Sequence, residues 1–197
     1  SAGAIVITTK SGKNVKDKTS VTITSSYNVQ NVYGLPKYQN DYGQGTNNDF
    51  VNTSGNSWGP RFGTGGITTV TTRQGDVVPY QAFPNNEKDW FQQGSILQNT
   101  VSIASGKGDN NYILSIGNQD QIGIIKNTGF GRINVQFGGN AKLSNGFKIS
   151  SNITYALTTQ KGQPQGNGGS AIGNITRIPR SYDLNGRPYA DPIGNSI

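Results

Sequence analysis

Two stretches of two-residue alternation joined by a tight turn span residues 131–157 and constrain the fold more than any other feature of the chain. In the first stretch the apolar side chains, such as Val135 and Phe137, take the odd positions as far as Leu143. After the turn at 144–146, most apolar side chains again take odd positions. Because successive side chains of a strand point to opposite faces, the pattern predicts a long β-hairpin with one apolar and one polar face.

This alternation fits two architectures. In a soluble sandwich the apolar face packs against a second sheet, whereas in a transmembrane barrel it meets lipid and the polar face lines a wet interior. Each stretch has about the 9 to 11 residues that a tilted strand needs to cross a bilayer, while globular strands average about 5 or 6. The uniformly polar opposite face also favours lipid. Its side chains are Arg132, Asn134, Gln136, Asn140, Lys142, Lys148, Ser150, Asn152 and Thr154.

Composition limits the core that the chain can bury. Hydrophobic residues make up 31% of the 197, against roughly 45 to 50% apolar content, glycine included, in ordinary domains. The sequence has no Cys and no His, which excludes disulfides and thiolate or imidazole metal sites, so we expect no metal and no cofactor. No apolar run approaches the roughly 18 residues of a transmembrane helix. The sequence also has no Met, and we therefore expect an internal fragment.

The charged residues indicate neither nucleic-acid binding nor catalysis. The net charge is +7, but the one basic cluster, at 10–18, has no interleaved aromatic residues that would stack on bases, so we expect no nucleic-acid partner. The carboxylates are scattered, and we expect no catalytic residues and no enzyme activity. Six aspartates lie in predicted loops, where Asx turns are their usual role: Asp41, Asp49, Asp76, Asp89, Asp183 and Asp191.

The same periodicity organises the rest of the chain into an all-β fold. A short apolar run within 1–13 predicts a buried strand that ends a preceding domain, and 14–19 is a polar linker. Two long aperiodic stretches, 34–95 and 159–197, are predicted loops, in which 178–180 would be extended backbone at a surface. Long loops at one end of the strands and short turns at the other are typical of outer-membrane barrels. The predicted long strands are 20–33, 96–105, 111–121, 130–143 and 147–158.

An ordered series of short motifs resembles the SusC/RagA family of TonB-dependent outer-membrane transporters of Bacteroidetes. The resemblance covers nearly the whole chain, and the order of the motifs makes it more specific than any one of them. The motifs are SAGAIVITTKSGK at 1–13, SWGP at 57–60, NNEKDWFQQG at 85–94, YILSI at 112–116 leading into QIGI at 121–124, NTGFGR at 127–132 and IPR at 178–180.

The resemblance implies a fold and a function. Residues 1–13 would end a plug domain, and 20–197 would form the N-terminal part of an antiparallel transmembrane β-barrel of about 22 strands, with 34–95 and 159–197 as extracellular loops. The whole protein would be a multi-pass barrel in the outer membrane of a Gram-negative cell. It would import glycans or peptides with a SusD-like surface lipoprotein, energised by TonB through a segment outside this sequence. Its other partners would be outer-membrane lipid and the rest of its own barrel.

The candidate site residues fall into two groups. Substrate or partner contact is predicted for aromatic and basic residues of the long loop; in the alternative interpretation, the aromatic side chains instead pin the loop onto the barrel wall or the partner. These residues are Trp58, Arg61, Phe62, Trp90 and Phe91. A position facing the barrel lumen or the plug is predicted for Arg132, Asn134, Gln136, Lys142 and Lys148. The alternative function is a secreted or surface β-rich binding module or adhesin, in which the apolar faces would pack on each other.

Overall fold

The computed structural model describes residues 12, 15, 17–163 and 170–187. The chain divides into two compact units. The first, here called the sheet unit, comprises 1–30, 94–123 and 127–162, and the second, the loop unit, comprises 31–93, 124–126 and 163–197. Most of the predicted plug strand at 1–13, and parts of the predicted linker at 14–19 and of the loop at 159–197, lie outside the described residues.

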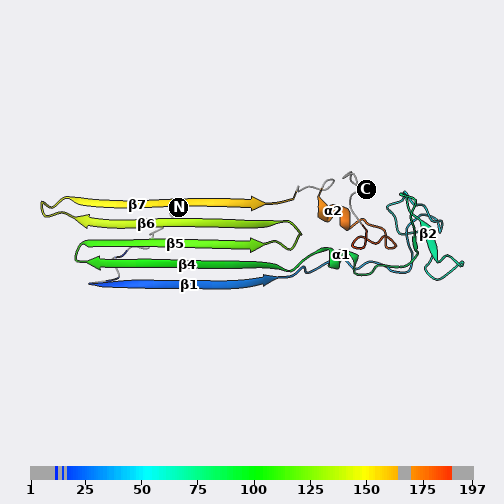
Figure 1. Ribbon diagram of the computed structural model, residues 1–197, viewed down its shortest axis with the longest axis horizontal. Helices are drawn as coiled ribbons and strands as arrows, with labels where there is room; N and C mark the ends of the chain where they lie inside the picture. Colours follow the sequence, from blue (N-terminus) through cyan, green and yellow to red (C-terminus); the bar gives the residue numbers. More distant parts are fainter. Residues whose placement is uncertain (1–11, 13–14, 16, 164–169, 188–197) are drawn as a thin grey trace, which may run out of the picture. The chain divides into compact units, whose positions relative to one another are not determined.

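The sheet unit is a five-stranded antiparallel sheet in the order β1-β4-β5-β6-β7 (Figure 1). Each of these strands lies where the alternation predicts one, with ends that differ by three residues or fewer. The predicted all-β class is confirmed in the form of an antiparallel sheet. The strands are β1 at Lys18–Gln30, β4 at Gly94–Lys107, β5 at Asn110–Ile122, β6 at Gly129–Lys142 and β7 at Lys148–Lys161.

The pairing register gathers the large apolar side chains on one side of the sheet, here called the apolar face. One row across the five strands consists of Ile23, Val101, Ile116, Val135 and Tyr155. The next row consists of Val21, Ile103, Leu114, Phe137 and Ile153. These side chains are largely open to solvent, with exposed fractions of 74% for Ile23 and 61% for Ile153. Among the described residues of the sheet unit, this is the only sheet.

The opposite side, here called the polar face, is tied together by side-chain hydrogen bonds between neighbouring strands. Ser102 Oγ and Ser115 Oγ lie 2.7 Å apart. Asn140 lies between two partners: its Nδ2 donates to Asn111 Oδ1 at 3.0 Å, and its Oδ1 accepts from Ser150 Oγ at 2.8 Å. Such cross-strand pairs reinforce the register that the backbone sets.

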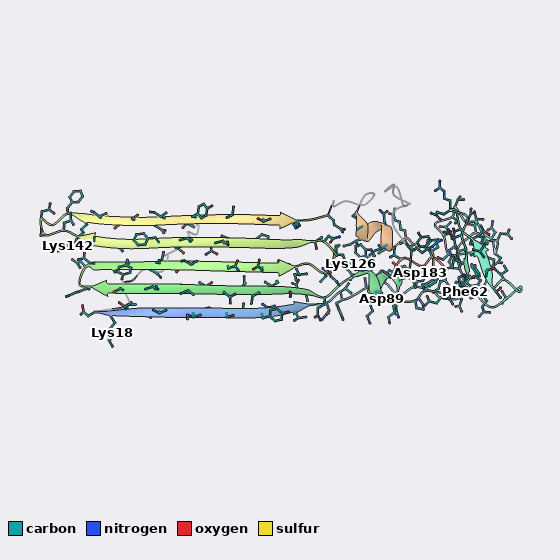
Figure 2. The ribbon with its side chains drawn as sticks, in the orientation of Figure 1. Lys18, Phe62, Asp89, Lys126, Lys142 and Asp183 are labelled. Atoms are coloured by element: carbon teal, nitrogen blue, oxygen red, sulfur yellow. The ribbon has the colours of Figure 1, made fainter. Side chains whose placement is uncertain are left out.

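Short turns and long connections lie at opposite ends of the sheet. Gly108 and Asp109 alone join β4 to β5, and residues 143–147 join β6 to β7. Figure 2 shows Lys18 and Lys142 at this same end. The long stretches after β1 and β7 begin at the other end, where Gln30 pairs with Gly94 in the sheet register.

Four small elements lie within the loop unit, in stretches where the sequence shows no periodicity. They are β2 at Thr69–Thr71, β3 at Val77–Pro79, α1 at Asn86–Trp90 and α2 at Ala171–Ile175. The side chain of Ser170 caps α2 by accepting a hydrogen bond from the Gly173 backbone N–H at 3.0 Å. Asp89 lies in α1, so its predicted place in an irregular loop is wrong.

Gly146 provides a test of the short-turn geometry. It has a φ of +86°, and its N–H donates to the Leu143 carbonyl at 2.9 Å. Because a Cβ is strained at this φ, Gly146→Ala should lower the free energy of unfolding by about 1 to 2 kcal/mol. Urea titration of the full-length protein measures this change. Ser144→Ala in the same turn is the control and should stay within about 0.5 kcal/mol of wild type; an equal loss in both variants would contradict the prediction.

Candidate functional site

Arg180 lies at the centre of the loop unit, with only 3% of its surface exposed. Its Nη1 donates to Glu87 Oε1 at 2.6 Å, while Nε and Nη2 donate to Asn40 Oδ1 at 3.2 and 3.0 Å. Nη2 also donates to the carbonyl oxygens of Phe83 and Pro84, both at 3.2 Å. The planar guanidinium, with its five donors, thus joins three stretches of chain that are far apart in sequence.

The backbone of Arg180 makes connections of the same kind. Its N–H donates to Ser57 Oγ at 3.0 Å, and its carbonyl accepts from the Phe83 N–H at 2.9 Å. The guanidinium carbon also lies 5.0 Å from the centre of the Tyr38 ring, within the range of a cation–π contact. The prediction that 178–180 forms extended backbone at a surface is therefore wrong at Arg180. The buried charge is tolerated because it is paired and hydrogen-bonded.

Helix α1 contributes a second buried polar residue next to Glu87. Asn86 and Glu87 are each 4% exposed. Asn86 Nδ2 donates to the Tyr182 carbonyl, and Asn86 Oδ1 accepts from the Leu184 N–H at 3.1 Å. The Asn86 carbonyl accepts from Asn185 Nδ2 at 3.0 Å. One short helix thus holds the segment that follows Arg180 through side-chain and backbone atoms alike.

An aromatic cluster around Tyr80 forms the other packed part of the loop unit. Tyr80 is 5% exposed, and its hydroxyl donates to the Pro60 carbonyl at 2.8 Å. The ring centres of Phe50 and Phe62 lie 6.0 and 5.0 Å from that of Tyr80, distances typical of favourable aromatic pairs. Gly43 passes so close that a Cβ there would overlap the Tyr80 ring. The glycine is therefore needed for this close approach.

A cavity of about 400 Å³ opens in the loop unit. Phe50 and Tyr182 are aromatic residues of its lining, and Arg187 and Asp183 are charged ones. Arg187 Nη2 lies 2.6 Å from Asp76 Oδ2, and the Arg187 guanidinium carbon lies 5.6 Å from the centre of the Tyr182 ring. The size is that of a small-molecule pocket. Aromatic faces next to charged donors and acceptors suit a polar solute rather than a purely apolar one.

Two tyrosines of the loop unit have shifted pKa values. Burial raises the pKa of Tyr80 above its ordinary value of 10.0, and the Gly43 backbone partly opposes this shift. Burial also raises the pKa of Tyr38; the nearby Glu87 carboxylate adds to the shift, while Arg180 opposes it. Both hydroxyls therefore stay protonated at neutral pH and act as donors, Tyr38 to the Thr176 carbonyl at 3.1 Å.

The predicted contact residues in the first half of the long loop do not form one cluster. Trp58 is 63% exposed, and its ring centre lies 6.0 Å from that of Tyr42. Arg61 is exposed and lies 3.8 Å from Asp41 in a surface ion pair. Phe62 instead packs within the aromatic cluster. Trp58 and Arg61 are thus accessible for contact, whereas Phe62 has a structural role.

Trp90 and Phe91 form a pair of their own at the end of α1. Their rings are perpendicular, with centres 5.2 Å apart, and both residues are half-buried. Neither lines the loop-unit cavity. Sequence reasoning missed Arg180, Glu87 and Asn86 as the polar centre of this unit. The available signal was their presence in the motifs at 85–94 and 178–180, but nothing in the sequence shows that those two motifs meet.

The residues predicted to face a lumen all belong to one side of the sheet. The polar face carries Arg132, Asn134, Gln136, Lys142 and Lys148. Asn134 lies over Gly117 on the neighbouring strand, where an added Cβ would come within 2.8 Å of Asn134 Oδ1. Lys142 lies 3.3 Å from Asp109 in an exposed ion pair. Their common face is consistent with the alternation, and their position in a lumen stays a prediction.

The described residues hold no group of three or more carboxylate, imidazole or thiol side chains that could bind a metal ion. In the part of the chain that the structure describes, no helix has the length and apolar character needed to span a membrane. No protein-family model matches the chain, and no curated protein matches it either. The resemblance to SusC/RagA transporters therefore rests on the sequence motifs alone and stays a prediction.

Removing Arg180 should unfold the loop unit locally. Arg180→Met leaves the Glu87 carboxylate buried without its partner, which should lower local stability by about 3 to 5 kcal/mol. Hydrogen exchange of residues 31–93 and 170–187 in the full-length protein measures this loss. The double variant Arg180→Met with Glu87→Leu should recover a large part of it, because no unpaired charge then remains buried.

Arg61→Met is the matched control, since Arg61 pairs with Asp41 at an exposed site. Its effect should stay below about 1 kcal/mol. Equal exchange in Arg180→Met and Arg61→Met would contradict the central role of Arg180.

The loop unit should also lose stability at alkaline pH. The pKa of Tyr80 is higher in the folded unit than the ordinary 10.0, so the unfolded chain releases this proton first. The stability that this residue contributes is present below about pH 10 and falls as pH rises beyond it. Hydrogen exchange between pH 8 and 11, corrected for the intrinsic rate, should show this loss, and Tyr80→Phe should weaken it. Tyr33→Phe, at a residue 98% exposed, should leave the profile unchanged; identical profiles for all three proteins would contradict the assignment.

Proposed function

We propose that this chain forms part of the wall and outer loops of a TonB-dependent outer-membrane importer of the SusC/RagA type, which takes up glycans or peptides. The observation that carries the proposal is the sheet unit: five long antiparallel strands with a wide apolar face whose large side chains are exposed within this unit. The resemblance of the ordered sequence motifs to SusC/RagA transporters supports the choice of family, and the exposed apolar face supports a membrane location.

Strand length supports membrane placement. The five strands have 13 or 14 residues each. At about 3.3 Å per residue and a tilt of about 45°, such a strand spans about 30 Å, which is the thickness of a bilayer's hydrocarbon core. The apolar rows would then face lipid, and the hydrogen-bonded polar face would line the interior.

The two edge strands of the sheet would need further pairing partners in lipid. Within the described strands, β1 and β7 each pair on one side only. Open edges in lipid would leave backbone N–H and C=O groups unsatisfied at several kcal/mol each. The wall would therefore be completed by further strands of the same barrel, about 22 in all. A plug that ends near residue 13 would fill its interior.

The loop unit would serve recognition on the cell surface. Its cavity, with Tyr182, Phe50 and Arg187 in the lining, suits a polar solute such as a sugar or a short peptide. The exposed ring of Trp58 would contact substrate or a SusD-like lipoprotein. Transport itself would be driven by TonB acting on the plug, and neither unit would carry out covalent chemistry.

Arginine substitutions on the two faces of β6 test the membrane placement. Val135 lies in the middle row of the apolar face, so Val135→Arg in the full-length protein should cost about 2 to 4 kcal/mol of folding free energy in phospholipid vesicles. Gln136→Arg, one residue along on the polar face, is the matched control and should cost less than about 1 kcal/mol, because its charge stays hydrated. Equal costs at the two positions would refute the assigned faces.

Shortening the Val135 side chain distinguishes the proposed barrel from the alternative binding module. In that alternative, the apolar face would be buried against another sheet. Val135→Ala should cost little in a lipid-facing position, since lipid fills the space that the side chain leaves. In a sandwich the same change leaves a cavity and costs about 2 kcal/mol or more. The proposal also requires the full-length protein to stay with the outer membrane after an alkaline wash. A protein that is soluble and monomeric without detergent would refute it.

A further inference from the structure

The apolar face is interrupted by a notch near the end of the sheet that carries the short turns. The register row across β4 to β7 consists there of Ser105, Tyr112, Gly139 and Ser151. Because Gly139 has no side chain, the row has a gap between Tyr112 and Ser151. The resulting depression has a volume of about 400 Å³.

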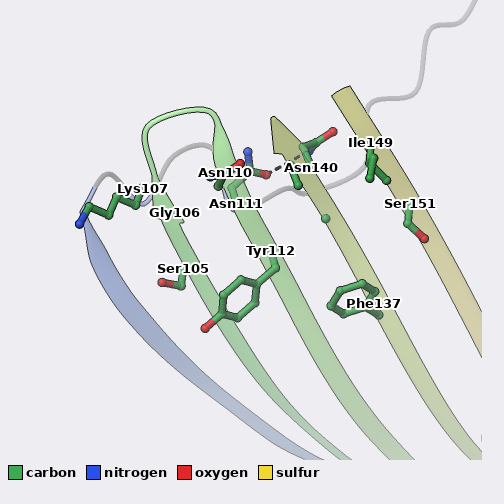
Figure 3. A pocket seen from close by; sticks show the side chains of 12 residues that line it. Ser105, Gly106, Lys107, Asn110, Asn111, Tyr112, Phe137, Asn140, Ile149 and Ser151 are labelled. Atoms are coloured by element: carbon green, nitrogen blue, oxygen red, sulfur yellow. Dashed lines mark hydrogen bonds between the residues drawn. The ribbon is translucent and has the colours of Figure 1, made fainter. Parts of the chain in front are cut away.

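The walls and floor of the notch are apolar. Figure 3 shows the rings of Tyr112 and Phe137 on neighbouring strands, with Ile149 beyond them on β7. The Phe137 ring leans over Gly139, since an added Cβ there would lie 3.4 Å from Phe137 Cζ. Phe137 and Ile149 remain 37% and 48% exposed. They therefore offer apolar surface that a chain of methylene groups would cover favourably.

The rim of the notch is polar and carries a positive charge. Ser105, Asn110 and Ser151 supply hydroxyl and amide groups, and Lys107 is the only charged residue among the described lining residues. Lys107 ends β4 directly before the turn at Gly108. A ligand that matches this surface has an anionic head at the turn end and an apolar tail that runs along the strands.

Other charges at this end of the sheet also favour an anion. Lys18 and Lys148 are exposed here. Each lies at the turn end of its strand, at a register position on the polar face. The acidic residue of the nearby turn, Asp109, is paired with Lys142 at 3.3 Å. A second acidic residue, Asp17, also lies at this end, where its N–H donates to the Gly106 carbonyl at 2.7 Å. Four lysines (Lys18, Lys107, Lys142 and Lys148) against two aspartates leave a positive balance among the described residues, and each basic residue near the surface attracts anionic lipid head groups by about 1 kcal/mol.

We infer that this notch binds one anionic phospholipid, with an acyl chain over Gly139 and the phosphate next to Lys107. The inference rests on the proposed function, because the notch meets lipid only if the apolar face does. It goes further in assigning one defined lipid site to a face that otherwise makes only general contact with the bilayer.

The test is a titration of the full-length protein in mild detergent with phosphatidylglycerol, in which native mass spectrometry counts the bound lipid. Gly139→Leu fills the notch and should weaken the first binding step by roughly tenfold, the loss expected for about two buried methylene groups. Gly131→Leu is the matched control: it makes the same change on the same strand and face, and an added Cβ there meets only Asp120 Oδ1 at 3.8 Å. It should bind as wild type.

A second pair of variants tests the contribution of the Lys107 charge to lipid binding. Lys107→Gln should weaken binding of phosphatidylglycerol by roughly fivefold, the factor that corresponds to one basic residue near an anionic head group. Lys161→Gln is its control, because Lys161 ends β7 at the opposite end of the sheet. Should Gly139→Leu fail to fold, as judged by its electrophoretic shift on heating, Ser151→Phe fills the same notch from the neighbouring strand and decides the question.

Weaker lipid binding by Gly139→Leu and Lys107→Gln, together with wild-type binding by their controls, supports the site. Equal binding by Gly139→Leu and Gly131→Leu, or equal loss in both, would overturn it, because the bound lipid would then be general annular lipid. A site that retains lipopolysaccharide in place of phospholipid would overturn it as well. Insertion of the same proteins into vesicles separates the two proposals: wild type that fails to insert refutes membrane placement, whereas normal insertion with equal lipid binding refutes the notch alone.

Discussion

Constant cross-strand register is the constraint on which the rest of the structure depends. The side-chain period of a strand is two, so a slip of one residue in any pairing would move a whole row of apolar side chains to the other face. The register keeps Ile23, Val101 and Ile116 in one row across three strands. Side-chain bonds on the reverse side, such as Ser102 to Ser115 at 2.7 Å, act on the same alignment. Because this sheet has little buried surface, hydrogen bonds rather than core packing fix which side chains lie on each face. The proposed division into a lipid-facing and a lumen-facing side depends on that fixed register.

The loop unit also has few buried apolar residues, and polar contacts hold it together. The buried hydrophobic core of the described residues consists of Tyr80, Ile113 and Ile175, and two of these belong to the loop unit. The centre of the unit is polar instead. Arg180 and Glu87 are joined at 2.6 Å, and the Asn40 side chain and two backbone carbonyl oxygens accept from Nε and Nη2 of the guanidinium. A buried ion pair of this kind contributes little net stability compared with packed apolar residues, but it allows few alternative arrangements of the chain around it. Such specificity suits the proposed recognition role of these loops.

The sequence predicted the sheet well and the loop unit poorly, for a physical reason. Strand position follows from a local period that can be read within about ten residues, which is why 111–121 and 130–143 agree closely with β5 and β6. The loop unit depends on contacts between distant residues, such as Arg180 with Asn40, and no local pattern encodes these. The sequence around Arg180, which follows Pro179, therefore indicates surface backbone, although Arg180 is buried. Residue type alone predicts contact for all the aromatic residues of the long loop, but the structure divides them between exposed positions, as at Trp58, and internal packing, as at Phe62.

The ion pair at the centre of the loop unit also links assembly of the loops to pairing of the strands. Glu87 and Arg180 are 93 residues apart, and β4, β5, β6 and β7 all lie between them. Closing so long a flexible segment costs conformational entropy, whereas a formed sheet has already closed most of it. Gly94 begins β4 and Lys161 ends β7 at the same end of the sheet, three strand spacings or about 14 Å apart. The ion pair therefore forms at a lower entropic cost once the strands have paired, so an error in strand pairing would also disfavour assembly of the loop unit.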